Sequence, residues 1–530
     1  MNFELKPLAL EQLSKLKTDA LLILVSNTSG ASLSHSANSG NPLSALIAQS
    51  LKTQQLESKA GKTLLLWNAL GLSANPLILA HTGENSPKDL RQALSSALQQ
   101  LKGAHSQCKH LTVYLPEVGG QKMQTALQAL ADSSYVYTTT KPSAKASALV
   151  KITICVPTVT AKSPEAVHLD QAFKEGVARV EGMAFAKEWG NRPANHATPT
   201  LLAKAAQTLA KYPRLSVQVL GPKEVARLGM GSFMSVAQGS DEPLRFIVMQ
   251  YFGAPKSEAP VVLVGKGITF DTGGISLKPG PGMDEMKFDM CGAASVLGVF
   301  KSLGHLQPRI NVVGLVPACE NMPSGRAVKP GDVVTSMSGQ TIENLNTDAE
   351  GRLILCDALT YAERFKPRVV IDIATLTGAC IIALGHLRSG MYANNDRLAQ
   401  DLLDSGERSL DPCWRMPLDE EYAEGLKSNF ADTANVADRS AGSVTAAKFL
   451  QRFVGQHQWA HLDIAGSAWK SGGAAKGATA RPVPLLLSYL LNEGQEVHRY
   501  QNTSPAKAVR KSSPAKKGAQ KSTRKARVKA

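Results

Sequence analysis

The sequence predicts an α/β protein in which an N-terminal α/β domain is joined by a long helix to a larger C-terminal α/β domain. Three observations predict this class. Short apolar runs alternate with helical patterns over the first 160 residues, one unbroken helical pattern follows, and a second alternation fills residues 245–492. A chain of 530 residues, with 43% apolar and 19% charged residues, is long enough for two or three domains with substantial cores.

The N-terminal domain is predicted from short apolar runs that are typical of buried strands. These runs are 20–26, 63–67, 76–80, 111–116 and 152–157. Between them, residues 86–101 begin with Ser-Pro and repeat apolar residues at helical spacing, which predicts a helix. Because strands that alternate with helices form largely parallel sheets, we expect one such sheet within residues 1–162.

A long helical pattern over residues 163–189 ends at the sequence "GNRP", so we expect residues 163–195 to connect the two domains. The C-terminal domain is expected over residues 196–495, again as an α/β alternation. Its predicted strands are 245–252, 260–267, 310–318, 368–375 and 460–466. Its predicted helices are 289–304, 351–365, 395–407, 441–454 and 482–492.

The net charge of +16 is concentrated at the C-terminal end of the chain. Residues 501–530 contain ten Lys or Arg and no acidic residue, which leaves a net charge of only +6 for the first 500 residues. The segment 496–530 is composed mainly of Ser, Pro, Ala, Lys and Arg, and it contains "SPAK" twice. Such a composition cannot bury a core, so we expect a disordered basic tail. The tail either keeps the protein soluble or contacts DNA or RNA nonspecifically through its charges.

The cysteines and the apolar runs indicate the compartment. The seven cysteines are widely scattered and include no CxxC pair, which argues against a disulfide framework and favours a reducing environment. No apolar run reaches the roughly 18–20 residues that a membrane span requires. The first twenty residues also lack the pattern of a signal peptide. We therefore expect a cytoplasmic protein without a membrane segment.

Acidic and basic residues gather at the ends of the predicted C-terminal strands. Residues 264–279 follow a strand and contain Lys266, Asp271 and Lys278, and residues 283–290 add Asp289. The sequence "NTDAEGRL" at 346–353 places Asp348, Glu350 and Arg352 at alternate positions before a helix. Ligands bind at this edge of a parallel sheet, and two divalent metals would offset the repulsion of four carboxylates there. A capped turn with surface acids is the alternative explanation of the same spacing.

Several segments together resemble the leucyl aminopeptidase (cytosol aminopeptidase) family. The resemblance covers about residues 165–490 and includes "NTDAEGRL", "VGKGITFDTGG", "ENMPSGRAVKPGDV", "PCWRMPL", "SNFADTAN" and "WAHLDIAG". It implies a metallopeptidase that removes N-terminal residues, preferably leucine-like, from peptides. It also implies a homohexamer, and two divalent ions per subunit, manganese or zinc. Some family members also act as DNA-binding accessory proteins, which is the alternative function that we retain.

The resemblance implies roles for individual residues as well. One metal would be held tightly by Lys266, Asp271, Asp289 and Glu350. A second, more exchangeable metal would be held by Asp271, Asp348 and Glu350. Lys278 matches the catalytic lysine of the family, and Arg352 matches the arginine that holds a bicarbonate. The residues that match the walls of the substrate pocket are Met286, Thr375, Gly378 and Ala465.

Other candidate motifs are incomplete. "GKT" at 61–63 lacks the first glycine of a phosphate-binding loop, because residue 56 is leucine. No HExxH or GxSxG motif is present, and we expect Cys356 and Cys380 to be core residues. His386 and His461 show no metal-ligand spacing, so structural roles are predicted for both.

Overall fold

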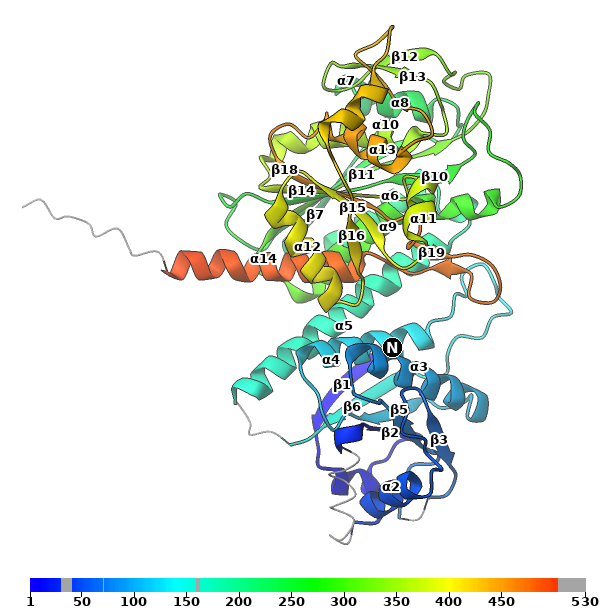
Figure 1. Cartoon of the computed structure of the whole chain (residues 1–530), viewed down its shortest axis with the longest axis vertical. Helices are drawn as coiled ribbons and strands as arrows, with labels where there is room; N and C mark the ends of the chain where they lie inside the picture. The colour runs from blue at the N-terminus through cyan, green and yellow to red at the C-terminus, as the bar shows by residue number, and fades with distance from the viewer. Residues whose placement is uncertain (30–40, 70, 159–162, 504–530) are drawn as a thin grey trace, which may run out of the picture.

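The computed structural model describes residues 1–29, 41–69, 71–158 and 163–503, without the side chains of 495–503. Two α/β bodies lie at opposite ends of the long axis, and the helix α5 (Pro164–Asn191) runs between them (Figure 1). This arrangement is the fold class that the sequence predicts. The predicted domain boundaries are not fixed by the structure, although α5 lies within the expected connector.

The N-terminal body contains a six-stranded sheet with the order β1-β6-β5-β2-β4-β3. Its strands are β1 (Asn2–Pro7), β2 (Ala20–Val25), β3 (Thr63–Leu66), β4 (Leu77–His81), β5 (His110–Tyr114) and β6 (Lys151–Val156). All pairs are parallel except β3 with β4. Its main helices are α2 (Pro42–Lys52), α3 (Pro87–Ala104) and α4 (Gly120–Ser134). The predicted parallel sheet is confirmed, but the edge strand β1 was missed, because polar residues interrupt its apolar pattern.

The connecting helix α5 packs closely against α9 (Cys291–Leu306) of the larger body. The two helices meet at glycines: a Cβ at Gly182 would lie 2.4 Å from the carbonyl oxygen of Gly298. Only residues without side chains allow the backbones to approach this closely. The N-terminal body also contacts the other side of α5 through α4, so α5 packs against both bodies.

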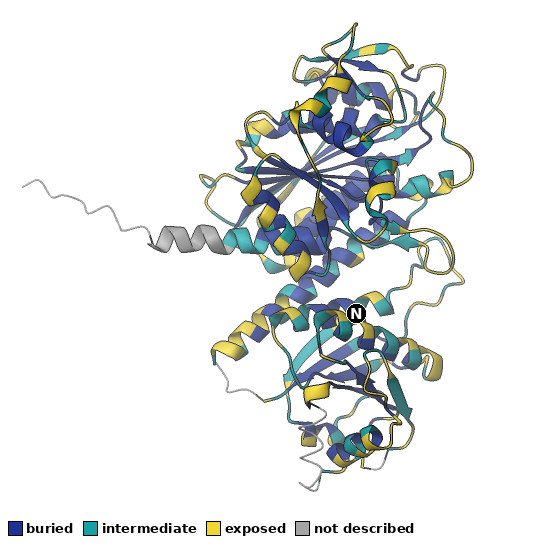
Figure 2. Ribbon diagram, viewed as in Figure 1, coloured by how far each residue is buried: buried dark blue, intermediate teal, exposed yellow. Residues whose placement is uncertain are grey.

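The larger body is built on a nine-stranded sheet with the order β16-β15-β18-β14-β9-β11-β8-β7, and β10 pairs with β11. Its strands are β7 (Leu215–Leu220), β8 (Arg245–Phe252), β9 (Val261–Gly265), β10 (Gly267–Asp271), β11 (Asn311–Asn321), β14 (Val369–Ala374), β15 (Ser389–Ala393), β16 (Cys413–Arg415) and β18 (Gln458–Asp463). The four central strands, β18, β14, β9 and β11, are parallel, and they are buried on both faces (Figure 2).

Helices cover both faces of this sheet and form two hydrophobic cores. One core includes residues of α5, α6 (Pro199–Gln207), α9, α12 (Asp396–Arg408) and α14 (Val483–Thr503). The other includes residues of α8 (Gly231–Ala237), α10 (Glu350–Ala362) and α13 (Gly442–Gln451). Short helices and small sheets complete the body: α7 (Pro222–Arg227), α11 (Gly378–Leu384), β12 (Asp332–Thr335), β13 (Thr341–Asn344), β17 (Thr433–Ala434), β19 (Trp469–Lys470) and β20 (Gly477–Ala478).

The C-terminal helix α14 is longer than the pattern of apolar residues predicts. Its apolar residues end near Leu491, but the backbone stays helical to Thr503, since no proline or glycine stands between Gly494 and Pro505. Most of the predicted basic tail, residues 504–530, lies outside the described residues. Among the helices that the structure does describe, none combines the length and the apolar character needed to cross a membrane.

Candidate metal centre

The site begins where strand β10 ends, at Asp271, beside the ends of the central strands. Two neighbouring glycines, Gly273 and Gly274, have φ values of +86° and +66°, which turn the chain sharply after the strand. The carboxylate of Asp271 accepts hydrogen bonds from the backbone N–H of Gly273 (2.9 Å) and from the Asn321 side chain (2.8 Å), both at Oδ1. Asp271 is thereby fixed with one oxygen left for other partners.

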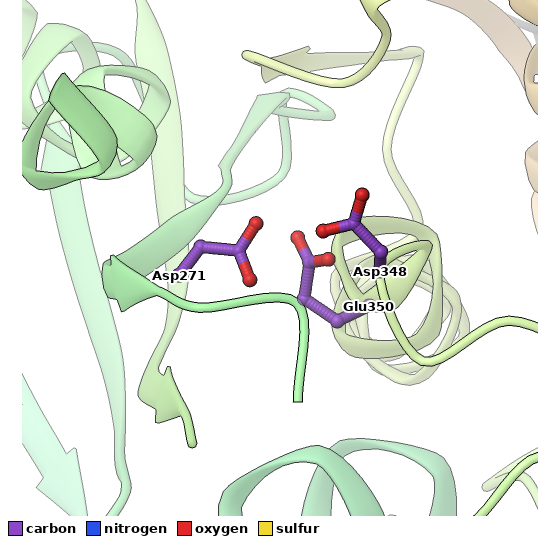
Figure 3. A group of neighbouring side chains, drawn as sticks. All are labelled: Asp271, Asp348 and Glu350. Carbon is purple, nitrogen blue, oxygen red and sulfur yellow. The ribbon is translucent and has the colours of Figure 1, made fainter. Parts of the chain in front are cut away.

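Three carboxylates converge at this point. Asp271, Asp348 and Glu350 each offer an oxygen, and these oxygens lie within 4.8 Å of one another. Figure 3 shows the three side chains pointing toward one another from the end of β10 and from the start of α10. Asp348 lies in the loop before α10, and Glu350 is the first residue of that helix. The spacing of two residues in the sequence therefore places both acids on the same side as Asp271.

Lys266 connects this cluster to Asp289. The Lys266 ammonium lies 2.8 Å from an oxygen of Asp289 and 2.8 Å from an oxygen of Glu350. Thr375 donates a hydrogen bond to the other Asp289 oxygen (2.6 Å). Burial alone would lower the pKa of Lys266, but the carboxylates of Asp289, Glu350 and Asp271 raise it above its usual range. Asp289 was expected at the start of a helix, but it lies in the preceding 3-10 turn η5 (Met283–Met290).

A glycine makes room for Lys266. A Cβ at Gly351 would lie 2.6 Å from Cε of Lys266, so the second position of α10 must lack a side chain. The "EGR" of the sequence motif thus places an acidic residue, Glu350, and a cationic residue, Arg352, on either side of the glycine against which Lys266 packs. Because Gly351 has no side chain, Lys266 can pass close to the start of α10 and pair with Glu350.

Lys278 lies at the more open side of the cluster. Its ammonium pairs with Asp271 at 2.8 Å and also with Asp348. Burial would lower the pKa of Lys278, but Asp271, Glu350 and Asp348 raise it. The side chain is 21% exposed, whereas those of Lys266 and Glu350 are 3% and 2% exposed. Lys278 is therefore a cation that a substrate can approach.

The donor set fits divalent metal ions. Oxygen Oε2 of Glu350 is buried and accepts no hydrogen bond, although it lies in a cluster of charged groups. A buried carboxylate oxygen without a partner is costly unless a cation satisfies it. Four carboxylates and one amine suit manganese, magnesium or zinc better than copper or nickel. The residues present therefore fit a divalent metal, and Asp271, Asp348 and Glu350 form the candidate site.

Arg352 lies in the first turn of α10 and is 6% exposed. Its Nη1 donates a hydrogen bond to the backbone oxygen of Asn435 (2.7 Å), while its Nε is buried without a partner. Burial lowers the pKa of Arg352 to about 10, and Glu350 and Asp463 oppose this change. The N-cap residue of α10, Ala349, supplies no side-chain acceptor for the first N–H groups. A buried guanidinium beside a helix N-terminus can bind a small anion.

The four residues expected to line a substrate pocket come from three neighbouring segments. Thr375 follows β14 and Ala465 follows β18, and these strands are adjacent and parallel. Gly378 begins α11, and a Cβ there would meet nothing within 4 Å. Met286 lies in η5 and is partly exposed. Thr375 is thus close to Asp289 as well, which links the expected pocket to the expected metal ligands.

Asn321 and Asn435 support the site, but the sequence did not single them out. Asn321 bonds Asp271 and the backbone oxygen of Thr347 (3.0 Å). The Asn435 side chain accepts from the N–H of Leu345 (2.8 Å) and donates to Asn344 (2.9 Å) and to the backbone oxygen of Asn346 (2.8 Å). Asn321 lies in the segment "ENMPSGRAVKPGDV" and Asn435 in "SNFADTAN", so only the family resemblance of these segments could have indicated their roles.

The residues assigned to structural roles are consistent with those roles. Cys356 and Cys380 are buried, and so are the other five cysteines, all of which are free thiols. His461 is fully buried, with Nδ1 2.5 Å from a carboxylate oxygen of Asp372. His386 bonds the backbone oxygen of Gly466 through Nδ1 (2.8 Å).

An α/β domain with four carboxylates and two lysines gathered at the ends of its parallel strands is the architecture of a metallohydrolase. Comparison with known proteins narrows this class. The family model described as "Cytosol aminopeptidase family, catalytic domain" matches residues 184–487, and the model of that family's N-terminal domain matches residues 24–143. The chain belongs to the cytosol aminopeptidase family. It is a leucyl aminopeptidase, a metal-dependent hydrolase that removes N-terminal residues from peptides.

Individual relatives resemble the chain over nearly its whole length. A probable cytosol aminopeptidase from a Polaromonas species is 58% identical over 97% of this chain and 99% of its own. The protein of the same name from Polaromonas naphthalenivorans is 56% identical over 98% of each chain. Among solved structures, a mutant of tomato leucine aminopeptidase superposes with a TM-score of 0.79 at 30% identity, covering 93% of this chain and 96% of its own.

Proposed function

We propose that the carboxylate cluster holds two divalent ions, manganese or zinc. Lys266, Asp271, Asp289 and Glu350 hold one ion, and Asp271, Asp348 and Glu350 hold the other. The observation that supports this assignment most strongly is the buried Oε2 of Glu350, which accepts no hydrogen bond inside a charged cluster. When bound, such a pair of ions supplies Lewis acidity and lowers the pKa of an attacking water.

Lys266 changes its protonation state in this proposal. Without ions its ammonium pairs with Asp289 and Glu350, whereas a lysine that binds metal must be a neutral amine. Metal binding should therefore release a proton from Lys266 and become weaker as the pH falls.

Lys278 is the residue proposed to act on the substrate directly. Its ammonium can donate a hydrogen bond to the oxygen of the scissile carbonyl and stabilise the negative charge that develops there. Its partial exposure and its position between Asp271 and Asp348 support this role. Arg352 and the first N–H groups of α10 hold bicarbonate as a proton acceptor beside the cluster, which the buried and unpartnered Nε of Arg352 supports.

A preference for leucine-like N-terminal residues follows from the proposed pocket. Met286, the Thr375 methyl group, Gly378 and Ala465 offer apolar surface and open space. A pocket of this kind suits a medium-sized apolar side chain, and burial of such a side chain contributes about 1.5–3 kcal/mol.

The metal assignment is tested by metal content and by hydrolysis of leucine amide. Purified wild-type protein should contain close to two divalent ions per chain. Glu350→Ala should lose both ions and its activity, because Glu350 is proposed to bind each of them, while Asp289→Ala should lose mainly one. Glu343→Gln, which changes a buried glutamate outside the cluster, serves as the matched control. Equal metal content in wild type and Glu350→Ala would contradict the assignment.

A second function, accessory binding of DNA or RNA, is favoured by one observation. The last thirty residues contain ten Lys or Arg and no acid, which is a composition that binds polyanions. We also propose a homohexamer and a cytoplasmic location. The relatives named cytosol aminopeptidase and the seven free, buried cysteines support the location.

A further inference from the structure

A large cavity lies between the two bodies, and none of the residues that line it belongs to the carboxylate cluster. Its volume is about 800 Å³. One wall comes from the N-terminal body, through α3 and α4 and the segment that follows α4, and the other comes from η5 and the β19–β20 hairpin. Figure 1 shows this hairpin on the side of the larger body that faces the N-terminal body. Cavities of about 300–1,000 Å³ are the size that binds small molecules.

The lining of this cavity has a strong excess of positive charge. It contains seven cationic residues, Arg91, Lys141, Lys187, Lys287, Lys470, Lys476 and Arg481. Only two acidic residues, Asp132 and Asp411, line it with them. Both acids are already paired, Asp132 with Lys187 (2.5 Å) and Asp411 with Arg481 (2.5 Å). Lys476 pairs outside the lining, with Asp284 (2.6 Å) and Glu285 (3.1 Å).

Four of these cations form no ion pair with any described residue. Arg91 and Lys141 belong to the N-terminal body, and Lys287 and Lys470 belong to the larger body. Arg91 and Lys287 are partly buried, and each donates to a backbone oxygen, of Leu410 (3.5 Å) and of Asn191 (3.1 Å) respectively, which does not neutralise its charge. Gathering unpaired cations from two bodies around one cavity costs free energy unless an anion binds between them.

The cavity also offers surfaces for a flat or apolar group. The aromatic rings of Tyr135, Tyr137 and Phe288 line it. Tyr135 is already beside a cation, since the Lys187 ammonium lies 5.3 Å from the centre of its ring. Aromatic rings next to lysines are a common environment for ligands that combine a charged part with a ring.

We propose that this cavity binds a small anion with several charged phosphate-type groups, which contacts Arg91 and Lys141 on one side and Lys287 and Lys470 on the other. The ligand thus bridges the two bodies. Inorganic polyphosphates and nucleoside phosphates share this chemistry. The proposal does not depend on the peptidase reaction, because none of these four residues belongs to the proposed metal or substrate site.

Titration calorimetry of the full-length, metal-loaded protein with inorganic triphosphate, and separately with adenosine triphosphate, tests the proposal. Arg91→Gln and Lys470→Gln change one cation on each wall. The controls Lys88→Gln, on the same helix as Arg91, and Lys223→Gln change exposed lysines outside the cavity. Every variant keeps the basic tail and the metal site, so heat from these sources is the same in all of them.

We expect each cavity variant to weaken binding about tenfold and the double variant about a hundredfold, with the controls unchanged. Tighter binding of adenosine triphosphate than of triphosphate would place its rings against the tyrosines, and equal binding would limit recognition to the phosphates. Equal affinity in all variants would overturn the proposal, because the tail or the metal site would then bind the anion. Weaker binding in only one of the two variants, Arg91→Gln or Lys470→Gln, would overturn the proposal that the ligand bridges the two bodies. Leucine-amide hydrolysis at the wild-type rate verifies that each variant is folded.

Discussion

At the scale of single residues, the candidate site combines opposite charges held by neutral side chains. Each of the two lysines pairs with two of the four carboxylates, which leaves an excess of negative charge, and amides and hydroxyls orient the acids. Asn321 and Thr375 each fix one carboxylate, of Asp271 and Asp289 respectively. Such contacts align charged groups before any ligand arrives, which is the requirement for electrostatic catalysis.

Lys278→Ala should reduce kcat for leucine-amide hydrolysis by roughly 10²–10³, which is the typical cost of losing one donor to a developing oxyanion. The metal content should stay near that of the wild type, since loss of a cation next to Asp271 and Asp348 does not weaken their attraction for metal. Kinetics and metal analysis of the same preparation give both quantities. A variant that loses its metal would instead assign Lys278 to the ligands.

Asn435→Ala should impair the site although the Asn435 side chain contacts none of the proposed metal ligands. The Asn435 side chain is fully buried and holds the loop of residues 344–346 that leads to Asp348 and Glu350. Its loss leaves buried polar groups without partners, at about 1–3 kcal/mol each. We expect a lower melting temperature, weaker metal binding and a lower kcat, with added manganese restoring part of the activity. A drop in stability with unchanged metal affinity would show that Asn435 supports only the fold.

The sequence could predict the proposed ligands but not this support. Asp348, Glu350 and Asp271 stand at the ends of recognisable elements, so their convergence follows from the topology of a parallel sheet. Asn435 contacts a loop about 90 residues earlier in the chain. Such a contact depends on where β17 pairs with β13, and no local pattern specifies that pairing.

At the scale of elements, strands with apolar runs were predicted well and polar or short ones were not. The central strands β9, β11, β14 and β18 are buried on both faces, and long apolar runs make up β9 and most of β11 and β14. Strand β7 alternates buried and exposed residues at the edge of the sheet, and it was missed. Two contacts position helix α10. Gly351 lies against the Lys266 side chain at the start of the helix, and further along Asp357 accepts hydrogen bonds from the backbone N–H groups of Phe233 and Met337.

Asp357 should make the packing of α10 depend on pH. Its carboxylate accepts hydrogen bonds from the N–H groups of Phe233 (2.8 Å) in α8 and Met337 (2.7 Å), but burial raises its pKa to about 7. The folded state therefore binds more protons than the unfolded state between the ordinary value of 3.8 and about 7, and this group's contribution to stability falls as the pH rises through that window.

Asp357→Asn removes this ionisation. The melting temperature of the variant minus that of the wild type should increase from about pH 4 to pH 7 and stay constant at higher pH. Any pH-independent cost of the amide shifts this difference by the same amount at every pH. Calorimetry of both proteins at several pH values measures the difference. A difference that is independent of pH would show that Asp357 titrates normally in the folded protein.

At the scale of the whole molecule, the chain joins a catalytic body to an N-terminal body and a basic tail. The family models match both bodies, and the predicted two-body class is confirmed. The cavity between the bodies could not be predicted, because its lining comes from segments far apart in the sequence, from Arg91 to Pro484. The tail is defined by composition alone, and its proposed role in binding nucleic acid is separable from catalysis.

Deleting residues 504–530 should leave leucine-amide hydrolysis and the proposed hexamer intact, since none of the proposed ligands or pocket residues lies in that range. The deletion removes all ten cations of the tail. If all ten contacted phosphates, log K against log salt would have a slope of about −9 per chain, and we expect about −3 to −6 for a tail that makes fewer contacts. DNA binding of both forms, measured from low to physiological salt, decides this. Equal affinity would show that any DNA site lies on the folded bodies.

The central claim is that the five proposed ligands hold two ions at one edge of the sheet. Crystals of the manganese-loaded enzyme, measured by anomalous diffraction at the manganese edge, test it most directly. The account predicts two anomalous peaks per chain, about 3.5–4 Å apart, with Glu350 and Asp271 between them and Lys266 and Asp348 on opposite sides. A single peak, or a pair of peaks that Glu350 does not bridge, would contradict the account.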